Sequence, residues 1–252
     1  MLSEKYKCDQ PGKTEFLVAP LDNGHFITDV CDLEKSYYIE NSRTLERRRI
    51  DVIKNVSFEI DENESVAIMG KSGCGKTTLL KMMGGLLSPS NGYISFKGEK
   101  LSDFDNERIE NYRRRQVGFV FQDYKLLDNM TIKENMILPC ILDHQDIAEA
   151  LDKVEKIAEM LNICDRLEHY PYELSGGEKQ RAAVGRALIN SPSIIFADEP
   201  TGNLDADTSK AVMDMLIGLQ HEFKIAMIIV THDKDIADYC CRTVHIQDGK
   251  MY

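Results

Sequence analysis

The sequence predicts an α/β fold built on a mostly parallel β-sheet that helices cover. Three short apolar runs, residues 117–121, 193–197 and 226–230, are rich in β-branched and aromatic side chains. Such unbroken runs are typical of strands buried on both faces. A fourth run, residues 65–69, leads directly into a glycine-rich loop. Segments with helical spacing lie around these runs, as expected of helices that cover a parallel sheet.

The elements before the glycine-rich loop are predicted to be strands. We assign no element to residues 1–25 and treat them as an N-terminal extension of open role. From Phe26 onward the pattern is strand-like, and residues 52–69 alternate apolar and polar positions on either side of an acidic turn at residues 61–64. Two strands joined by that turn are therefore expected.

Two helices are predicted downstream from the 3.6-residue spacing of apolar positions, at about residues 146–162 and 208–221. The buried face of the first should carry Ile147, Leu151, Val154, Ile157, Ala158 and Leu161. The second should point Val212, Met215, Leu216 and Leu219 inward. Core packing explains both faces.

Composition limits the classes of function. The chain has 252 residues, 42% of them hydrophobic, which suits one large domain or two small ones. Its net charge of −11 disfavours non-specific attraction to nucleic acid, so no nucleic-acid partner is expected. Arginine triplets at 47–49 and 113–115 are interpreted as solvated surface, with contacts to a partner or to phospholipid as the alternative.

A cytoplasmic, soluble chain is expected. The first residues lack the apolar core of a secretory signal, and no apolar run approaches the roughly 20 residues that cross a bilayer. Seven cysteines, an odd number without the paired spacing of zinc sites, indicate a reducing compartment. Cys240 and Cys241 are predicted to be packing residues rather than ligands.

Polar residues follow each of the four predicted parallel strands. The glycine-rich loop follows residues 65–69, Gln122 follows 117–121, Asp198 and Glu199 follow 193–197, and Thr231 and His232 follow 226–230. Ligands of open α/β sheets bind outside the carboxyl ends of the strands. These four groups should therefore converge on one pocket.

The loop sequence GKSGCGKT, residues 70–77, matches the phosphate-binding pattern of nucleotide-binding proteins. Glycines allow the backbone N–H groups to approach phosphate, and the helix beginning near Lys76 adds its positive end. Lys76 should reach the β- and γ-phosphates and Thr77 should offer its hydroxyl to Mg²⁺. Cys74 should contribute only its backbone, a reactive thiol being the alternative. The predicted set is Gly70, Lys71, Ser72, Gly73, Cys74, Gly75, Lys76, Thr77 and Thr78.

Adjacent carboxylates at Asp198 and Glu199 suit hydrolysis beside a triphosphate. Asp198 is placed to hold Mg²⁺ through its water shell, and Glu199 can reach the attacking water. Such a pair also occurs at helix caps and solvated turns, but downstream of a phosphate loop it is a strong indication.

A second glycine-rich helix start occurs at Ser175, Gly176 and Gly177, within LSGGEKQR. Ser175 suits an N-cap, and the exposed backbone donors could bind another anion, although a flexible turn before a helix is the simpler interpretation. One nucleotide rarely needs two such cradles from the same subunit. A head-to-tail dimer, with each nucleotide between the loop of one chain and the Ser175 helix of the other, resolves this.

Together, the segments GKSGCGKTT, FQDY, LSGGEKQR, IIFADEP, TGNLD and VTHD resemble in order and spacing the motif set of an ABC-transporter ATPase subunit. The resemblance implies a P-loop NTPase (RecA-like) fold, with an antiparallel β subdomain and an inserted α-helical subdomain. The implied ATPase domain covers residues 26–252. Its core lobe is residues 26–120 and 190–252, and its helical subdomain is residues 121–189.

The resemblance also implies roles for single residues, with ATP and Mg²⁺ as cofactors. Gln122 would sense Mg²⁺ and the attacking water, Glu199 would be the general base, and His232 would contact the γ-phosphate. The signature residues Ser175, Gly176, Gly177 and Glu178 would meet the partner's nucleotide, with Asp205 as the acid of the inter-subunit loop. Tyr37 would stack on adenine, with Tyr38 as the alternative.

Within the family, ADEPTGNLD and FQDYKLLDNMTIKEN resemble the lipoprotein-release, macrolide-export and cell-division branch. The segment SPSIIFADEPTGNLD and the C-terminal residues are similar to bacitracin-type antimicrobial-peptide resistance transporters. This resemblance implies a separate membrane permease, a sensor kinase acting through it, and a peripheral location on the inner face of the membrane. Residues Leu126, Leu127, Met130 and Ile132 are either a groove for a permease helix or core of the helical subdomain.

Two alternatives share the motif set. Soluble ABC ATPases of DNA repair carry a long coiled coil, and those of translation carry two motif sets, neither of which is present here. A regulatory complex of the cell-division or lipoprotein-release type would use the same ATPase with a different membrane partner. Co-purification from membranes separates the soluble class from the others.

Overall fold

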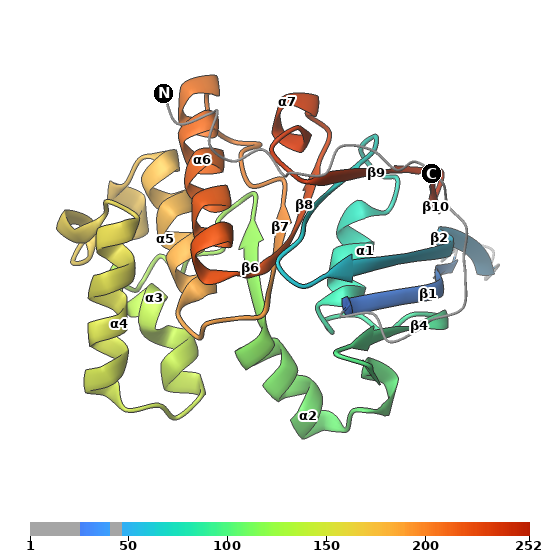
Figure 1. Cartoon of the computed structure of the whole chain (residues 1–252), viewed down its shortest axis with the longest axis horizontal. Helices are drawn as coiled ribbons and strands as arrows, with labels where there is room; N and C mark the ends of the chain where they lie inside the picture. The colour runs from blue at the N-terminus through green and yellow to red at the C-terminus, as the bar shows by residue number, and fades with distance from the viewer. Residues whose placement is uncertain (1–25, 41–46) are drawn as a thin grey trace.

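The computed structural model describes residues 26–40 and 47–252 (Figure 1). The predicted N-terminal extension, residues 1–25, lies outside the described residues. In the described part, the strands are β1 (Phe26–Glu40), β2 (Arg47–Asp61), β3 (Ser65–Met69), β4 (Asn91–Phe96), β5 (Glu99–Lys100), β6 (Val117–Phe121), β7 (Ile194–Asp198), β8 (Ala226–Thr231), β9 (Arg242–Gln247) and β10 (Lys250–Met251). The α-helices there are α1 (Lys76–Met83), α2 (Asn106–Asn111), α3 (Ile132–Leu142), α4 (Ile147–Met160), α5 (Gly176–Leu188), α6 (Ala206–Phe223) and α7 (Lys234–Ala237).

One sheet has the strand order β10-β9-β3-β8-β7-β6 and confirms the predicted parallel architecture. Strands β3, β6, β7 and β8 each begin and end within one residue of the four predicted runs. The pairs β3–β8, β8–β7, β7–β6 and β3–β9 are parallel. Strand β10 pairs with β9 in the antiparallel direction, at the outer side of the sheet. The segments that follow β3, β6, β7 and β8 therefore all leave the sheet on the side where the parallel strands have their carboxyl ends.

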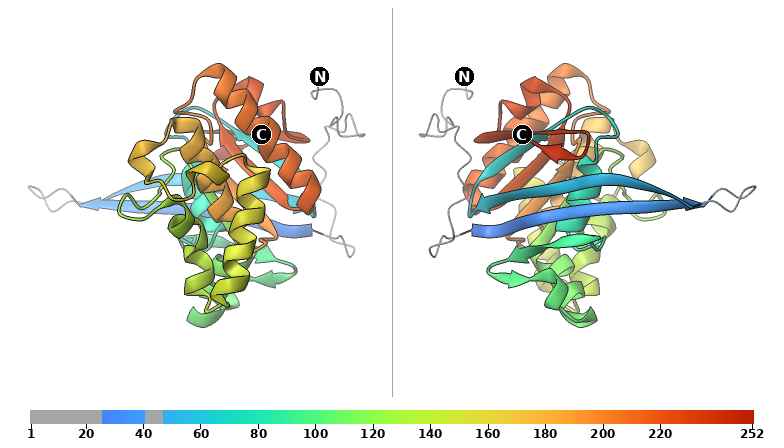
Figure 2. Two further views of the ribbon diagram at one scale, coloured as in Figure 1. Left: turned by 90° about the vertical axis from the view of Figure 1, so that its left-hand side faces the viewer. Right: turned by 90° about the vertical axis from the view of Figure 1, so that its right-hand side faces the viewer.

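The other sheet is antiparallel, with the order β2-β1-β4-β5. Strand β1 pairs with β2 along its whole length, to Glu40 opposite Arg47, but pairs with β4 only as far as Glu34. The outer ends of β1 and β2 thus form a two-stranded ribbon that extends beyond the other strands (Figure 2). The predicted acidic turn is present after β2, and it joins strands of different sheets.

Helices α3, α4 and α5 lie between β6 and β7 along the chain and pack on one another, on the opposite side of the molecule from β1 and β2 (Figure 1). The apolar core forms two clusters separated by the parallel sheet. Successive residues of β7 point to alternate clusters, Ile195 toward the helices α3–α5 and Phe196 toward α1, as strand geometry requires. The predicted fold class, including the inserted helices, is confirmed.

The first predicted helix is confirmed as α4, but the predicted burial of Ile147 is wrong. Val154 and Leu161 are fully buried, whereas Ile147 is 49% exposed. Ile147 is the first helical residue after the cap Asp146, whose side chain accepts the backbone N–H groups of the first turn. One turn later, Ala150 takes the buried position.

The second predicted helix is confirmed as α6, which begins two residues before the predicted start and ends two residues after the predicted end. Val212, Leu216 and Leu219 are buried as predicted. Met213 is fully buried, whereas Met215 is only half-buried, because the buried stripe passes through Met213 rather than Met215.

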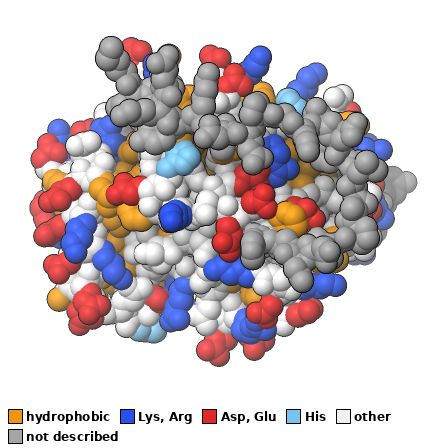
Figure 3. Space-filling model, viewed as in Figure 1, with side chains coloured by type: hydrophobic (Ala, Val, Ile, Leu, Met, Phe, Trp, Pro, Cys, Tyr) orange, Lys and Arg blue, Asp and Glu red, His pale blue; other side chains and the backbone are white. Residues whose placement is uncertain are grey.

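The molecular surface mixes acidic and basic side chains, as the face in Figure 3 shows. The triplet 47–49 is exposed on β2. The second triplet is partly structural: Arg113 donates to the Gly85 carbonyl at 3.0 Å, and Arg115 donates to the Asp143 carboxylate at 2.8 Å. Cys240 packs against the core, and burial raises the pKa of its thiol to about 12. In the described part of the chain, no helix has both the length and the apolar character needed to cross a membrane.

Candidate functional site

The glycine-rich loop after β3 forms an open cradle in front of α1. Gly73 and Gly75 have φ angles of 78° and 106°, a region that favours glycine. Gly75 occupies the N-cap of α1 and offers no side-chain acceptor, so the first N–H groups of the helix stay available to a ligand. A cavity of about 170 Å³ lies here, lined by Val52, Ser72, Gly73, Gly75, Lys76, Thr77, Thr78 and Glu199.

Lys76 is the cation of this cavity. Its side chain is only 5% exposed, and its ammonium group donates to the carbonyls of Gly70 at 2.7 Å and Lys71 at 3.1 Å. A buried ammonium needs such partners, because desolvation of an unpaired charge is costly. The lysine is therefore held over its own loop, beside the space that an anion would fill.

Asp198, the last residue of β7, lies next to the glycine-rich loop and the start of α1. Its carboxylate accepts the Thr77 hydroxyl at 3.1 Å. Burial raises the pKa of Asp198, with the neighbouring Glu199 carboxylate adding to the increase and the Thr77 hydrogen bond opposing it. A cation bound between Asp198 and Thr77 would offset the cost of burying this charge.

Glu199 lies between the Lys76 ammonium and the His232 imidazole. Its carboxylate is 4.0 Å from the Lys76 ammonium and 3.1 Å from Nδ1 of His232. Its backbone φ of 47° is in the left-handed region, which is unfavourable for a residue with a side chain and is often found at functional sites. The backbone N–H of Glu199 donates to the Val230 carbonyl at 2.9 Å, which anchors this conformation to β8.

Gln122, which follows β6, is hydrogen-bonded to Asn203. Its side-chain amide donates to Asn203 at 3.3 Å, and the Asn203 amide donates back to the Gln122 carbonyl at 2.9 Å. The close approach of Gly202 fixes this arrangement, because a Cβ at Gly202 would meet Gln122 Nε2 at 2.8 Å. Gln122 therefore does not line the 170 Å³ cavity in the described structure, and its role toward Mg²⁺ and the attacking water stays a prediction.

Tyr37 and Tyr38 lie on opposite faces of the β1–β2 ribbon. Tyr37 is opposite Ile50, and Tyr38 is opposite Arg49, so each pair shares a face. Ile50 lines a cavity of about 620 Å³, together with Asp51, Val52, Lys54, residues 70–74 and residues 245–249. Tyr37 therefore shares the strand face of Ile50, and Tyr38 shares the opposite face with Arg49. Cys74 also lines this cavity, and its half-buried side chain packs against the apolar core.

Ser175 begins α5 with a reciprocal capping arrangement. Its hydroxyl donates to the Glu178 carboxylate at 2.6 Å, and the same carboxylate accepts the Ser175 backbone N–H at 2.8 Å. These bonds and the Arg166 guanidinium lower the pKa of Glu178 to about 2. Asp205 caps α6 next to it, where the hydroxyl and backbone N–H of Thr208 lower the pKa of the aspartate.

Ser175, Gly176, Gly177 and Asp205 line a hollow of about 430 Å³, together with Arg181, Asn203, Leu204, Asp207, Thr208 and Ala211. None of these described residues also lines the 170 Å³ cavity. The structure thus brings together Lys76, Thr77, Asp198, Glu199 and His232, and it leaves the predicted signature residues at a separate site.

The cradle fits a nucleotide with Mg²⁺. It supplies uncapped N–H groups, a buried ammonium and positive-φ glycines, which are the groups that bind phosphate. Among the described residues, no cluster of three or more His, Cys, Asp or Glu side chains could hold a metal ion by itself. Mg²⁺ that binds with a nucleotide needs only one or two protein oxygens, which Thr77 and Asp198 provide.

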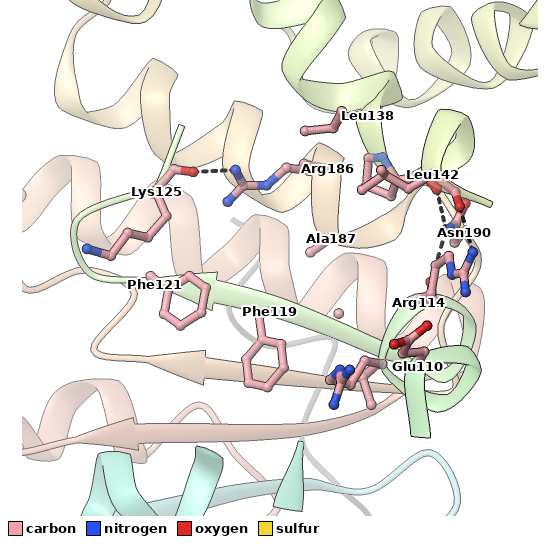
Figure 4. Close-up of a pocket in the computed structure, with 14 residues that line it drawn as sticks. Glu110, Arg114, Phe119, Phe121, Lys125, Leu138, Leu142, Arg186, Ala187 and Asn190 are labelled. Atoms are coloured by element: carbon pink, nitrogen blue, oxygen red, sulfur yellow. Dashed lines mark hydrogen bonds between the residues drawn. The ribbon is translucent and has the colours of Figure 1, made fainter. Parts of the chain in front are cut away.

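A groove of about 630 Å³ lies between β6, α3 and α5 (Figure 4). Its lining includes apolar residues from each of these elements, such as Phe119, Leu138 and Ala187. Arg186 ties the groove to the segment after Gln122, since its guanidinium donates to the carbonyls of Tyr124 and Lys125. Burial lowers the pKa of this arginine.

Residues Leu126, Leu127, Met130 and Ile132 were predicted to be either a groove or core, and none of them lines this groove. Ile132, at the start of α3, is fully buried in the core, and Leu126 packs against the same core. Asn203 and Arg186 are contacts that sequence reasoning missed. An amide directly after Gly202 and a buried arginine on an otherwise packed helix are the signals that could have drawn attention to them.

The chain is similar to known proteins over most of its length. The family model of the ABC transporter matches residues 53–202. The bacitracin export ATP-binding protein BceA of Halalkalibacterium halodurans is 37% identical over 90% of this chain and 87% of its own length. The lipoprotein-releasing system ATP-binding protein LolD of Cytophaga hutchinsonii is 38% identical over 79% of this chain and 91% of its own.

A solved structure is similar throughout. The dimeric post-hydrolysis state of the ATP-binding cassette MJ0796, bound to ADP and Pi, has a TM-score of 0.80 and 34% identity, covering 88% of this chain and 95% of that one. The relatives include the bacitracin and lipoprotein-release types that the motifs resemble, so this resemblance is confirmed. Because the family model matches more than half of the length of this chain, the chain belongs to the ABC transporter family, as an ATPase subunit.

Proposed function

We propose that two copies of this chain bind two ATP molecules head-to-tail and that this closure drives a separate membrane permease. The observation that carries the proposal is the separation of two glycine-rich helix starts, at α1 and α5, into cavities that share no lining residue. Two half-sites in one chain form two whole sites when a second copy is added. The similar MJ0796 cassette, which is dimeric and bound to ADP and Pi, supports assembly into a dimer.

Each residue of the cradle has a proposed role. Lys76 leaves the Gly70 carbonyl and neutralises charge on the β- and γ-phosphates. Thr77 and Asp198 would hold Mg²⁺, which supplies charge neutralisation on the phosphate oxygens. Glu199 accepts a proton from the attacking water, and His232, 3.1 Å from it, orients the carboxylate and contacts the γ-phosphate. Tyr37 stacks on the adenine.

A mixed dimer tests the shared sites. One chain carries Lys76→Ala and the other carries Ser175→Arg. If sites form between chains, one site receives both defects and the other none, so about half of the wild-type ATPase rate should remain. Purification through two different affinity tags isolates the mixed species, and phosphate release measures its rate.

The matched control places both substitutions on one chain and pairs it with a wild-type chain. Shared sites then each receive one defect, and hydrolysis should be lost. Sites contained within single chains give the reverse pattern in the two mixtures, which would rule out the head-to-tail arrangement.

We further propose that the groove of Figure 4 receives a segment of the permease. We also propose that residues 121–189 form a helical lobe, that residues 26–120 and 190–252 form a core lobe, and that the groove lies between these two lobes. The groove combines apolar walls with the basic side chains of Arg113, Arg114, Lys125 and Arg186, against one acidic residue, Glu110. A helix with an apolar face and at least one carboxylate would match this lining. Arg186 then couples the groove to the Gln122 segment.

Leu142→Asp should release the chain from the permease. Leu142 is 59% exposed at the edge of the groove. An aspartate there would remove an apolar contact with the permease segment and would compete with the carboxylate of that segment for the basic side chains of the groove. We expect about tenfold less chain to co-purify with membranes that contain the permease. Leu86→Asp is the control, because Leu86 is 49% exposed and lies outside the groove. Equal loss from both variants would contradict a specific docking role.

Export of an antimicrobial peptide is the proposed output, supported by the similarity to the bacitracin export protein BceA. Lipoprotein release is the second candidate, supported by the similarity to LolD. Pull-down of the chain from its own membranes and identification of the permease distinguish the two, because the permease carries the substrate specificity. Bacitracin sensitivity of cells that lack the chain is the accompanying test, and unchanged sensitivity would contradict peptide resistance.

A further inference from the structure

Ser175 has one hydroxyl hydrogen, and in this structure it is already engaged. The hydroxyl donates to Glu178 Oε2 at 2.6 Å, a length typical of a hydrogen bond to a charged acceptor. The same carboxylate oxygen accepts the Ser175 backbone N–H at 2.8 Å. Because a hydroxyl has a single donor, Ser175 cannot donate to another anion without first leaving Glu178.

The Glu178 carboxylate is held firmly in this place. Arg166 Nε donates to its second oxygen at 2.7 Å, and the glutamate side chain is only 19% exposed. With its pKa lowered to about 2, the carboxylate is charged at any physiological pH. A negative charge in the first turn also reduces the attraction of the α5 N-terminus for a further anion.

We propose that Glu178 is a positioning residue that competes with the partner's nucleotide for the Ser175 hydroxyl and thereby weakens the ATP-closed dimer. The inference rests on the proposed head-to-tail function, in which Ser175 donates to the terminal phosphate bound by the other chain. On closure, the Ser175 hydroxyl exchanges its hydrogen bond to the Glu178 carboxylate for one to the partner's phosphate. Once phosphate leaves, Glu178 takes the hydroxyl back, and the dimer reopens.

The test uses the full-length chain with Glu199→Gln, so that bound ATP is not consumed. Sedimentation velocity measures the dimer dissociation constant at saturating ATP and Mg²⁺. Glu178→Gln keeps the side-chain length but offers a neutral, weaker acceptor, so we expect the dimer dissociation constant to fall about three- to tenfold. Glu178→Ala, which lacks the acceptor, should act in the same direction. The affinity of the single chain for ATP should not change, since its own loop is at the other site.

Glu134→Gln is the matched control. Glu134 caps α3 with Thr131 in the same reciprocal way, accepting the Thr131 N–H at 2.7 Å, but lines neither cavity. It should leave the dimer constant unchanged. In a Ser175→Ala background, Glu178→Gln should no longer tighten the dimer.

The outcomes distinguish failure of the Glu178 competition from failure of the head-to-tail dimer. A dimer that is equally tight or looser in Glu178→Gln overturns the competition, because a purely structural cap can only lose stability when weakened. Tightening that persists without the Ser175 hydroxyl also overturns it. If the Glu199→Gln chain remains monomeric with ATP, the proposed function fails first.

Discussion

Replacing Glu199 by Gln is expected to slow ATP hydrolysis by about 10²- to 10⁴-fold while ATP binding persists and a dimer accumulates. The glutamine has nearly the same shape but cannot accept the proton of the attacking water. The Glu199 carboxylate lies 4.0 Å from the Lys76 ammonium and 3.1 Å from His232. A water that attacks the γ-phosphate of a nucleotide in the cradle would lie next to this carboxylate. Phosphate release measures the rate, and sedimentation measures the dimer.

A matched control for this substitution is Glu59→Gln. Glu59 is partly buried on β2, outside the cavity, and should keep the wild-type rate. Hydrolysis at the wild-type rate in Glu199→Gln would remove this residue from the base role. Loss of ATP binding in that variant would instead assign the carboxylate to holding Lys76 in place.

Lys76→Ala is expected to lower ATP hydrolysis by at least about 10²- to 10³-fold, with nucleotide affinity reduced as well. The ammonium is 5% exposed and is the one cation that lines the 170 Å³ cavity in the described part of the chain. Alanine leaves the developing charge on the phosphates without this partner and leaves the Gly70 carbonyl unpaired. A fluorescent ATP analogue measures binding, and phosphate release measures turnover.

Lys210→Ala removes a lysine from the outer part of α6 and serves as the comparison for loss of charge alone. It should retain both binding and turnover. Normal turnover in Lys76→Ala would contradict the phosphate cradle, and with it the use of the glycine-rich loop as the nucleotide site.

The parallel strands could be predicted from the sequence because strands buried on both faces are apolar without interruption. Their ends also predicted the site: Asp198, Glu199 and His232 meet the loop because parallel strands end at one edge. The helix faces were less certain at their ends. Ile147 carries the right spacing, but as the first residue of α4 it is 49% exposed, and Ala150 takes the buried position.

Contacts between segments distant in sequence could not be predicted. The choice between Tyr37 and Tyr38 depended on strand register, which places Tyr37 opposite Ile50. The turn of Gln122 toward Asn203 depends on how closely Gly202 approaches it. The groove combines residues of β6, α3 and α5, so no single run of sequence carries its pattern.

The separation of the 170 Å³ and 430 Å³ cavities within one chain has a kinetic consequence. An enzyme assembled from two incomplete halves works at a rate per molecule that increases with its own concentration, and dilution silences it. A permease that holds two copies side by side removes this dependence, because tethering sets a high effective concentration that dilution does not change. The membrane partner would then act as a scaffold that keeps the two ATPase subunits together, in addition to using the energy of ATP hydrolysis.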